Sequence, residues 1–176
     1  MGRIHLVRVG AVSTEMVKAI GHGIGETLGC LIKIHCEVLC PDFAFDARRS
    51  QYHSTEILTR LETLYPGLND PILGIAEVDL FIPILTFVFG EAFLGRPPAV
   101  ISLHRLHPQF YGLPDDSQQV LQRAQTEAVH ELGHTFGLIH CPNYACVMHA
   151  SRVADEIDLK GPGFCPACLS ILAVRI

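Results

Sequence analysis

The stretch His-Glu-Leu-Gly-His-Thr-Phe-Gly-Leu-Ile-His, at positions 130 to 140, constrains the fold of this chain more than any other. His130 and His134 are four residues apart, so on a helix their imidazoles lie one above the other on the same face. Gly137 can adopt a left-handed conformation that ends the helix and turns the chain back. This turn would bring His140 beside the other two, so the run predicts a helix that ends at a three-histidine metal site.

The three histidines predict a zinc site that keeps one position for water. Three imidazoles leave the fourth position of a tetrahedral zinc open, and zinc lowers the pKa of its water to roughly 7. Glu131 flanks the pair of histidines, where its carboxylate can accept a proton and deliver it to a leaving group. A structural helix with surface histidines is the competing interpretation. Another scheme takes the third ligand from an acidic residue downstream, namely Asp155, Glu156 or Asp158.

Four cysteines directly downstream predict a second metal site. Their spacing is Cys-x4-Cys, then 18 intervening residues, then Cys-x2-Cys, which is typical of a closed structural zinc site with four thiolates. Two disulfides or buried free thiols are the alternatives. Because the first cysteine directly follows His140, the closed site would brace that histidine. The four cysteines are Cys141, Cys146, Cys165 and Cys168.

Met148 follows the second of these cysteines by two residues and completes a wider pattern. A methionine turn downstream of HExxHxxGxxH is a mark of the metzincins. The chain resembles the archaemetzincins, whose pattern HExxHxxGxxHC, then x4-C-x-M, then x16-C-x2-C, matches at every fixed position. Segments around Asp79, 87–92 and 102–106 also look like this family. The resemblance implies a zinc peptidase in which Gly137 and Met148 have structural roles.

The order of the elements predicts an α/β (α+β) fold for residues 1–176 as a single metzincin-like domain. Strand and helix patterns alternate, which indicates a twisted, mixed but mostly parallel sheet of four to five strands. The resemblance adds a cleft, a long active-site helix and a Met-turn. We expect strands over 4–9, 28–39, 72–76, 87–92 and 100–106. We expect helices over 15–24, from a cap at Ser54 to about residue 64, and from 117 through the histidine pair.

Charged and sulfur-containing side chains outside the metal pattern receive simpler interpretations. Arg123 and Glu127, on the long helix, are expected to form a surface ion pair. Cys30 and Cys36 are expected to be small buried side chains of the second strand. Cys40 ends that strand, and the spacing of these three cysteines supports no third metal site.

By resemblance, the segment 87–92 is the edge strand that pairs with an extended substrate through backbone hydrogen bonds. Its candidate substrate-binding residues are Phe89, Gly90 and Glu91. An ordinary core strand is the alternative, and the sequence does not separate the two. His149 is expected to be at most a supporting or substrate contact.

Composition and charge limit the classes of function. With 49% hydrophobic and 18% charged residues, the chain belongs among globular proteins. A net charge of −5 without a basic block gives no support to nucleic-acid binding. The longest apolar tract, 80–90, is interrupted by Pro83 and falls short of the roughly 20 residues that a membrane span needs. No export signal is evident, so we expect a cytoplasmic location, where thiols bind zinc rather than form disulfides.

The expected function is therefore that of a monomeric zinc metallopeptidase with a peptide or protein substrate and no nucleic-acid or membrane partner. We expect two zinc ions per chain, one catalytic and one structural. A rival hypothesis is a zinc-binding protein without turnover that holds peptides in its cleft, and another is a non-peptide amide hydrolase. The position of Glu131 favours an enzyme, because a structural site would more naturally close the fourth coordination position.

Overall fold

The computed structural model describes residues 2–175 of the chain, in which five strands form the main sheet. Their order is β2-β1-β5-β8-β7, and all neighbours run parallel except β7, which is antiparallel to β8. The predicted mixed, mostly parallel sheet is confirmed. Its strands are β1 Arg3–Val9, β2 Leu31–Leu39, β5 Ile72–Ala76, β7 Gly90–Ala92 and β8 Pro98–Ser102.

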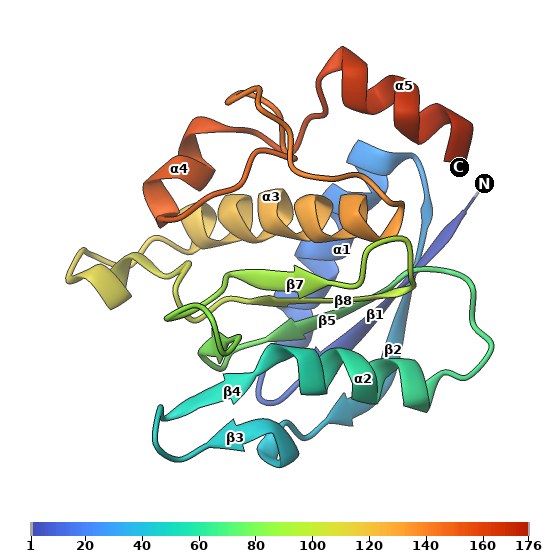
Figure 1. The fold of residues 1–176 in the computed structure, drawn as a ribbon. Coiled ribbons are helices and arrows are strands. Elements are labelled where there is room, and N and C mark those ends of the chain that lie inside the picture. Colours follow the sequence, from blue (N-terminus) through green and yellow to red (C-terminus); the bar gives the residue numbers. More distant parts are fainter. Residues whose placement is uncertain (1, 176) are drawn as a thin grey trace.

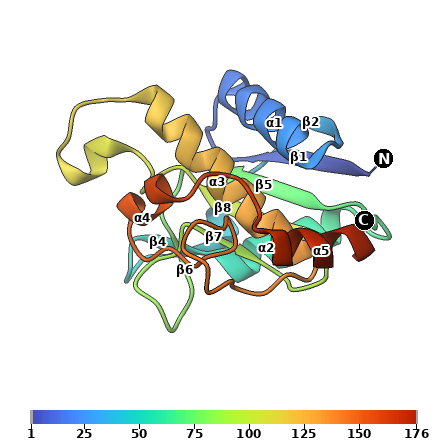
Figure 2. The ribbon, with the colours of Figure 1, turned by 90° about the horizontal axis from the view of Figure 1, so that it is seen from above.

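Helices cover both faces of this sheet (Figure 1). Helices α1 (Thr14–Leu28) and α3 (Ser117–Thr135) pack on one face, and α2 (Ser54–Leu64) packs on the other. Seen from above, α4 (Ala154–Leu159), α5 (Pro166–Arg175) and the loop between them cross over α3 (Figure 2). The remaining elements are a small sheet of β3 Phe45–Asp46, β4 Gln51–His53 and β6 Leu80–Phe81, and the 3-10 turns η1 Asp42–Ala44 and η2 Pro108–Tyr111.

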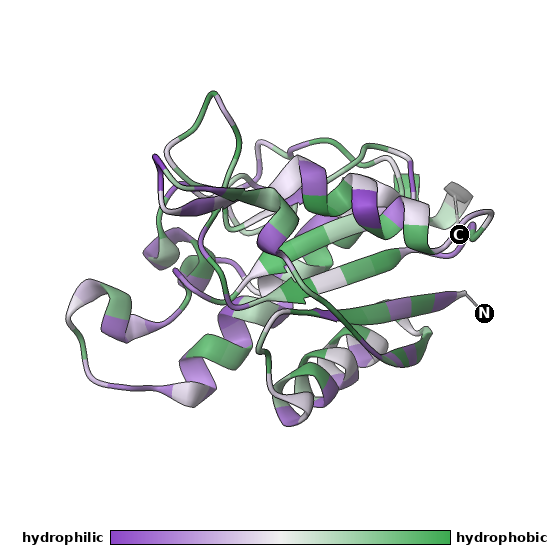
Figure 3. Ribbon diagram, turned by 90° about the horizontal axis from the view of Figure 1, so that it is seen from below, coloured by the Kyte–Doolittle hydropathy of each residue, from purple (hydrophilic) through white to green (hydrophobic). Residues whose placement is uncertain are grey.

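The central strands are buried on both faces, which is why they read as continuous apolar runs. Every residue of β5 and β8 is buried, and Figure 3 shows these strands hydrophobic along most of their length. Leu73 and Ile75 point to the side of α1 and α3, whereas Ile72 and Val100 pack with α2. The sheet therefore separates two apolar layers. No helix in the described part of the chain is long and apolar enough to cross a membrane.

Helix α3 has clear start and stop signals. The Asp116 carboxylate accepts a hydrogen bond of 2.9 Å from the backbone N–H of Gln119, as an N-cap does. Beyond the last turn, Gly137 has a φ of +83°, the left-handed conformation that glycine adopts without strain. The face of α3 that packs on the sheet is apolar and buried, with Ala124 and Leu132 fully covered. This packing holds the opposite face of α3, with its histidines, away from the sheet.

The N-terminal elements differ from the sequence predictions. Helix α1 continues through its glycines to Leu28. A Cβ atom at Gly21 would lie only 2.9 Å from the Leu6 side chain, so glycine lets the helix pack closely on the sheet. The predicted burial of Cys36 is wrong, since this side chain is exposed, and Cys30 is only half-buried. Cys30 also precedes β2, which begins at Leu31 and not at residue 28 as predicted. Strand β2 lies at the sheet edge, and its register against β1 shifts between the pairs Leu6–Ile34 and Arg8–Val38, so its alternation does not define one buried face.

Two further strands have different bounds from those predicted. Only Gly90–Ala92 pairs continuously with β8, while Val88 makes an isolated bridge with Leu80. Strand β8 ends at Ser102, whose hydroxyl donates to the Val78 carbonyl and accepts from the backbone N–H of His104. These bonds turn the chain out of the sheet before residue 106.

Candidate metal centres and active site

His130 and His134 lie one turn apart on α3, and backbone carbonyls fix both of their rings. The Nδ1 atoms of His130 and His134 donate to the carbonyls of Val147 and Leu138, each at 2.7 Å. A carbonyl can only accept, so in each ring the Nδ1 carries the proton and the Nε2 presents a lone pair. The two Nε2 atoms lie 3.2 Å apart. Both lone pairs are thus available to one shared ion.

The turn after α3 brings His140 to the same place. The backbone N–H of Gly137 donates to His134 O at 2.8 Å, and that of Leu138 donates to Gly133 O at 3.0 Å. The His140 ring centroid then lies 5.3 Å from that of His130 and 4.9 Å from that of His134. The sequence-predicted turn at Gly137 therefore assembles three imidazoles from one continuous stretch of chain.

The geometry and the charge state of the three imidazoles fit zinc. Their donor atoms lie within 4.8 Å of one another, and a tetrahedral zinc with bonds of about 2.1 Å keeps its ligand atoms about 3.4 Å apart. Burial, followed by nearby positive charge, lowers the pKa of all three histidines, that of His130 most strongly. The rings are consequently neutral at physiological pH, as metal ligands must be.

Glu131 is buried beside the histidines, with only 5% of its surface exposed. Burial, and then the negative charges of Glu127 and Glu91, raise its pKa well above the ordinary value. The carboxylate fits here because the facing residue of β7 is Gly90. A Cβ atom at Gly90 would lie 2.6 Å from Glu131 Cγ and 2.7 Å from Glu131 Oε1. The lack of a side chain at Gly90 therefore makes room for Glu131.

A cavity of about 520 Å³ lies between the edge strand β7 and α3. His130, Glu131, His134 and His140 form its polar floor. Its other wall is mostly apolar and comes from the segment leading into β7. The cavity is lined by Ile82, residues 85–92, Glu127, the four residues of the floor, and Ala150, Ser151 and Arg152. A cavity with a mostly apolar wall and a few converging polar groups is the usual form of a small-molecule or peptide binding site.

The three predicted substrate contacts all border this cavity, but their side chains differ in availability. Phe89 is buried and packs edge to face on Phe87 at 5.2 Å between ring centroids. The Glu91 carboxylate accepts hydrogen bonds from the hydroxyls of Ser54 at 2.5 Å and Thr55 at 2.8 Å. Ser54 is the first residue of α2 and not its cap as predicted, and the Glu91 carboxylate points to that helix.

The four cysteines also come together, with their sulfur atoms within 4.8 Å of one another. Cys141 Sγ and Cys165 Sγ are 3.7 Å apart, and Cys165 N donates to Cys146 Sγ at 3.3 Å. All seven cysteines, each within the described residues, are free. A hydrogen bond from the backbone N–H of Cys168 lowers the pKa of the Cys165 thiol to about 7, whereas burial raises the pKa of the Cys168 thiol. A bound metal would deprotonate all four thiols. This donor set also fits zinc, without an open position.

A single turn, residues 146–149, connects the two clusters. Cys146 contributes a sulfur to one cluster, while the carbonyl of Val147 accepts from His130 of the other. Met148 is fully buried, and a Cβ at Gly133 of α3 would collide with its sulfur. The backbone N–H of Cys141 closes the arrangement by donating to Met148 O at 2.9 Å. The cysteine cluster therefore holds the turn whose Val147 carbonyl orients His130.

The predicted surface ion pair on α3 is wrong. Arg123 and Glu127 are 3% and 4% exposed, and each has a partner from the C-terminal region. Arg123 donates to Asp158 at 2.6 and 2.8 Å and to Leu106 O at 2.9 Å. This pairing also occupies one of the acidic residues considered as a third metal ligand. Glu127 lies beside Lys160, because α4 folds back over α3 and covers this part of the helix.

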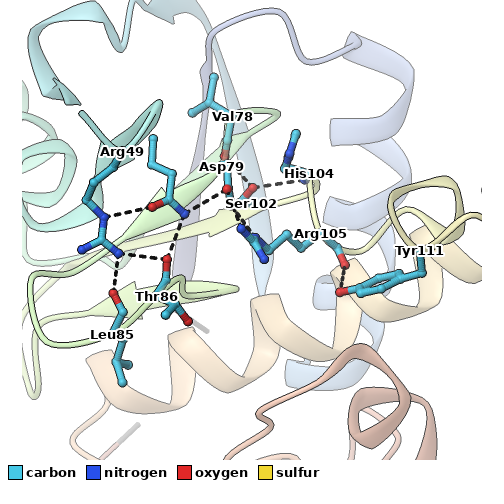
Figure 4. A network of polar contacts seen from close by, with 10 residues as sticks. Arg49, Val78, Asp79, Leu85, Thr86, Ser102, His104, Arg105 and Tyr111 are labelled. Carbon is cyan, nitrogen blue, oxygen red and sulfur yellow. Dashed lines mark hydrogen bonds and ion pairs between the residues drawn. The ribbon is translucent and has the colours of Figure 1, made fainter. Parts of the chain in front are cut away.

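His149 does not line the cavity, since its Nδ1 donates to the carbonyl of Cys141 at 2.9 Å and its ring packs on Tyr144. The cavity wall is supported by a polar network that no sequence pattern predicts (Figure 4). Arg49 donates to the carbonyls of Leu85 and Thr86 at 2.7 and 3.0 Å. These bonds fix the segment that precedes β7. Only spatial proximity identifies them, because the partners are more than thirty residues apart.

Asp79 is the centre of this network. Its carboxylate accepts from Arg105 at 2.6 and 2.8 Å and from Gln51 at 2.9 Å (Figure 4). The Arg105 guanidinium in turn lies 4.2 Å over the ring of Phe87, which lines the cavity. Burial alone would raise the pKa of Asp79, but the hydrogen bonds and the charge of Arg105 hold it below the ordinary value.

A mixed sheet with a buried helix that presents three neutral imidazoles and a carboxylate to a cavity with a mostly apolar wall has the arrangement of a zinc-dependent hydrolase. Comparison with known proteins agrees with this class. The model of peptidase family M54 matches residues 27–174, and the chain belongs to this family. The expected archaemetzincin resemblance and the expected enzyme class are thereby confirmed.

Similar proteins and structures extend over almost the whole chain. The archaemetzincin of Methanocaldococcus jannaschii is 42% identical over 98% of this chain and 94% of its own length. That of Pyrococcus furiosus is 39% identical over 98% and 93%. The crystal structure of a zinc-dependent peptidase from Methanocorpusculum labreanum matches with a TM-score of 0.87 at 30% identity over 96% of this chain and 99% of the other. That of the Methanopyrus kandleri archaemetzincin gives 0.84 at 34% identity, over 99% and 94%.

Proposed function

We propose that His130, His134 and His140 hold the catalytic zinc of this metallopeptidase and that Glu131 is its general base and acid. The observation that carries this proposal is the convergence of three neutral imidazoles and one buried carboxylate on a single cavity. Zinc at this position supplies Lewis acidity toward water and toward the carbonyl of the scissile peptide bond.

Glu131 moves the proton in this scheme. Its carboxylate accepts a proton from the attacking water and passes it to the nitrogen of the leaving amine. A pKa raised by burial suits both steps, because a group that titrates nearer neutral pH can accept and release the same proton. The apolar wall of the cavity limits the access of bulk water and strengthens these charge interactions.

The substrate in this proposal is an extended peptide that pairs with β7. One edge of β7 is bonded to β8, and the residues Phe89, Gly90 and Glu91 border the cavity. Because the Glu91 carboxylate is engaged by α2, the contribution of this strand to the substrate comes from its backbone rather than from that side chain.

We also propose a second, structural zinc at Cys141, Cys146, Cys165 and Cys168, which gives two zinc ions per chain. We propose residues 1–176 as one catalytic domain that acts as a monomer, since each cluster and the cavity are built from one chain. Seven free cysteines favour a reducing compartment such as the cytoplasm. The net charge of −5 gives no basis for a nucleic-acid partner.

Glu131→Gln tests the catalytic assignment. We expect zinc content and thermal stability close to those of the wild type, because glutamine has the same shape as glutamate. We also expect the variant to lose peptide cleavage, measured by mass spectrometry on a library of unstructured peptides. The exposed Glu26→Gln is the matched control and should cleave like the wild type. Equal cleavage by wild type and Glu131→Gln would remove Glu131 from the mechanism. Absence of cleavage in zinc-loaded wild type would contradict the proposed peptidase activity.

A further inference from the structure

Lys160 is a buried cation next to the histidine site, and the proposed mechanism does not use it. It directly follows α4 and is 2% exposed, whereas Lys18 and Lys33, the other two lysines of the chain, are exposed. A buried ammonium is costly unless each of its three protons finds an acceptor. The acceptors of Lys160 therefore indicate what this side chain does.

The Lys160 ammonium connects two carbonyls of the turn 146–149. Its Nζ donates to Val147 O at 3.1 Å and to His149 O at 2.6 Å. Val147 O is the same atom that accepts 2.7 Å from His130 Nδ1. The two lone pairs of this carbonyl thus serve one histidine and one lysine. The bond to His149 O holds the next part of the turn, so the ammonium clamps the turn from both sides of Met148.

The third polar neighbour of the ammonium is Glu127, one helical turn before Glu131 on α3. Glu127 Oε1 forms an ion pair with Lys160 Nζ at 3.5 Å, and this buried oxygen has no hydrogen-bond partner among the described residues. The pair joins α3 to the segment after α4. It also balances the charge of Lys160, which would otherwise repel a zinc ion at the neighbouring histidines.

We propose that Lys160 is a positioning residue for His130: it fixes the Val147 carbonyl that orients the imidazole, with Glu127 as its counter-charge. This inference rests on the proposed zinc site at the three histidines. Outer partners of a metal-bound histidine set its tautomer and ring orientation, and their loss typically costs about 10–100-fold in metal affinity. Here the partner of the histidine is a backbone carbonyl, so the side chain that controls it is Lys160.

A buried ion pair that only stabilises the fold predicts different behaviour. In that case removing both charges together would restore the site, because no unpaired charge would remain. If Lys160 orients the carbonyl, the double substitution stays defective, since an apolar side chain cannot donate to Val147 O. A Glu127→Gln variant alone keeps the ammonium bonds to both carbonyls, so the geometry of His130 should persist.

The experiment uses the full chain with Lys160→Met, Glu127→Gln and the double variant, and Lys18→Met as the exposed control. A chelator competition measures how fast zinc leaves the weaker site, and total zinc shows whether the cysteine site remains filled. Cobalt(II) is then placed at the histidine site, where its visible spectrum reports ligand geometry. We expect faster zinc loss by about 10-fold or more and an altered cobalt spectrum in Lys160→Met and in the double variant. Glu127→Gln should keep the wild-type spectrum.

The outcomes separate this inference from the proposal on which it rests. If wild type and Lys18→Met bind no zinc beyond one ion per chain and show no cobalt spectrum with imidazole ligands, the three-histidine site itself is wrong. If they bind two and Lys160→Met releases zinc at the wild-type rate, the positioning role is wrong. Recovery of both the release rate and the spectrum in the double variant would likewise overturn it and leave only an ion pair. Should Lys160→Met fail to fold, the double variant, which carries no unpaired charge, decides between the two.

Discussion

Gly90→Ala should disable the enzyme without removing its metal. In the structure, the added Cβ would lie 2.6 Å from Glu131 Cγ and 2.8 Å from Val100 O. Carbon atoms in ordinary contact are about 3.5–4.0 Å apart, so roughly 1 Å of movement is required. Val100 O belongs to the backbone of β8 and cannot give way easily. Glu131 or strand β7 must therefore move.

The magnitude follows from this displacement. Overpacking of this kind costs about 1–3 kcal/mol, which in a chain of 176 residues corresponds to a melting temperature lower by roughly 2–12 °C. A catalytic group displaced by about 1 Å can lose on the order of 100-fold in rate. The three atoms nearest to the added Cβ belong to Glu131 and Val100 and not to a histidine, so zinc content should stay at the wild-type value.

The assay compares initial rates of peptide cleavage, zinc content and thermal unfolding. Gly25→Ala in α1 is the matched control, because its Cβ would meet Cys30 and Ile32 at 3.5 Å, an ordinary contact. This control should keep the wild-type rate and gain up to about 1 kcal/mol from helix propensity. A Gly90→Ala protein with wild-type rate and melting temperature would refute the argument that Gly90 is empty in order to seat Glu131.

Two other substitutions test the supports of the site. Cys165→Ser should lose the zinc of the cysteine cluster and melt at a lower temperature, because metal binding is coupled to folding; unchanged zinc and unchanged melting would count against that cluster. Asp79→Asn should lower stability at pH 7, because the pKa of the Asp79 carboxyl is depressed in the folded protein. Such a carboxylate stabilises the fold at pH values above its ordinary pKa of 3.8, and the effect is lost as the pH falls through the folded pKa. The gap in melting temperature between wild type and Asp79→Asn should thus narrow below about pH 4, and a gap that is constant with pH would contradict the assignment.

The histidine and cysteine clusters could be predicted from the sequence because their geometry is local. Helical periodicity places His130 above His134, and one glycine turn supplies His140. The same locality holds for Cys141 and Cys146 and for the pair Cys165 and Cys168. Spacing alone therefore carried the prediction that both donor sets assemble, and the structure brings each of them within 4.8 Å.

Other features escaped prediction because they depend on contacts between distant segments. Glu127 and Lys160 are 33 positions apart, and neither lies in a recognisable pattern. Glu127, as an acidic residue on a helix, was therefore predicted to be exposed. Glu91 looked available for substrate, although the hydroxyl of Ser54 engages it from α2. The prediction that Cys36 is buried failed for a different reason. Alternation of apolar and polar residues does not reveal that a strand lies at the sheet edge or that its register shifts. Tertiary arrangement decided each of these cases.

The turn 146–149 and the cysteine pair that seals it come late in the chain, and this order has a consequence during synthesis. The sheet, the edge strand and the apolar wall are complete by residue 102, and Glu131 follows soon afterwards. Lys160 and the last two cysteines emerge from the ribosome only afterwards. A nascent chain thus contains the sheet and the cavity wall before it contains the residues that hold the turn 146–149, so the histidine cluster can be braced only after the sheet has been synthesised.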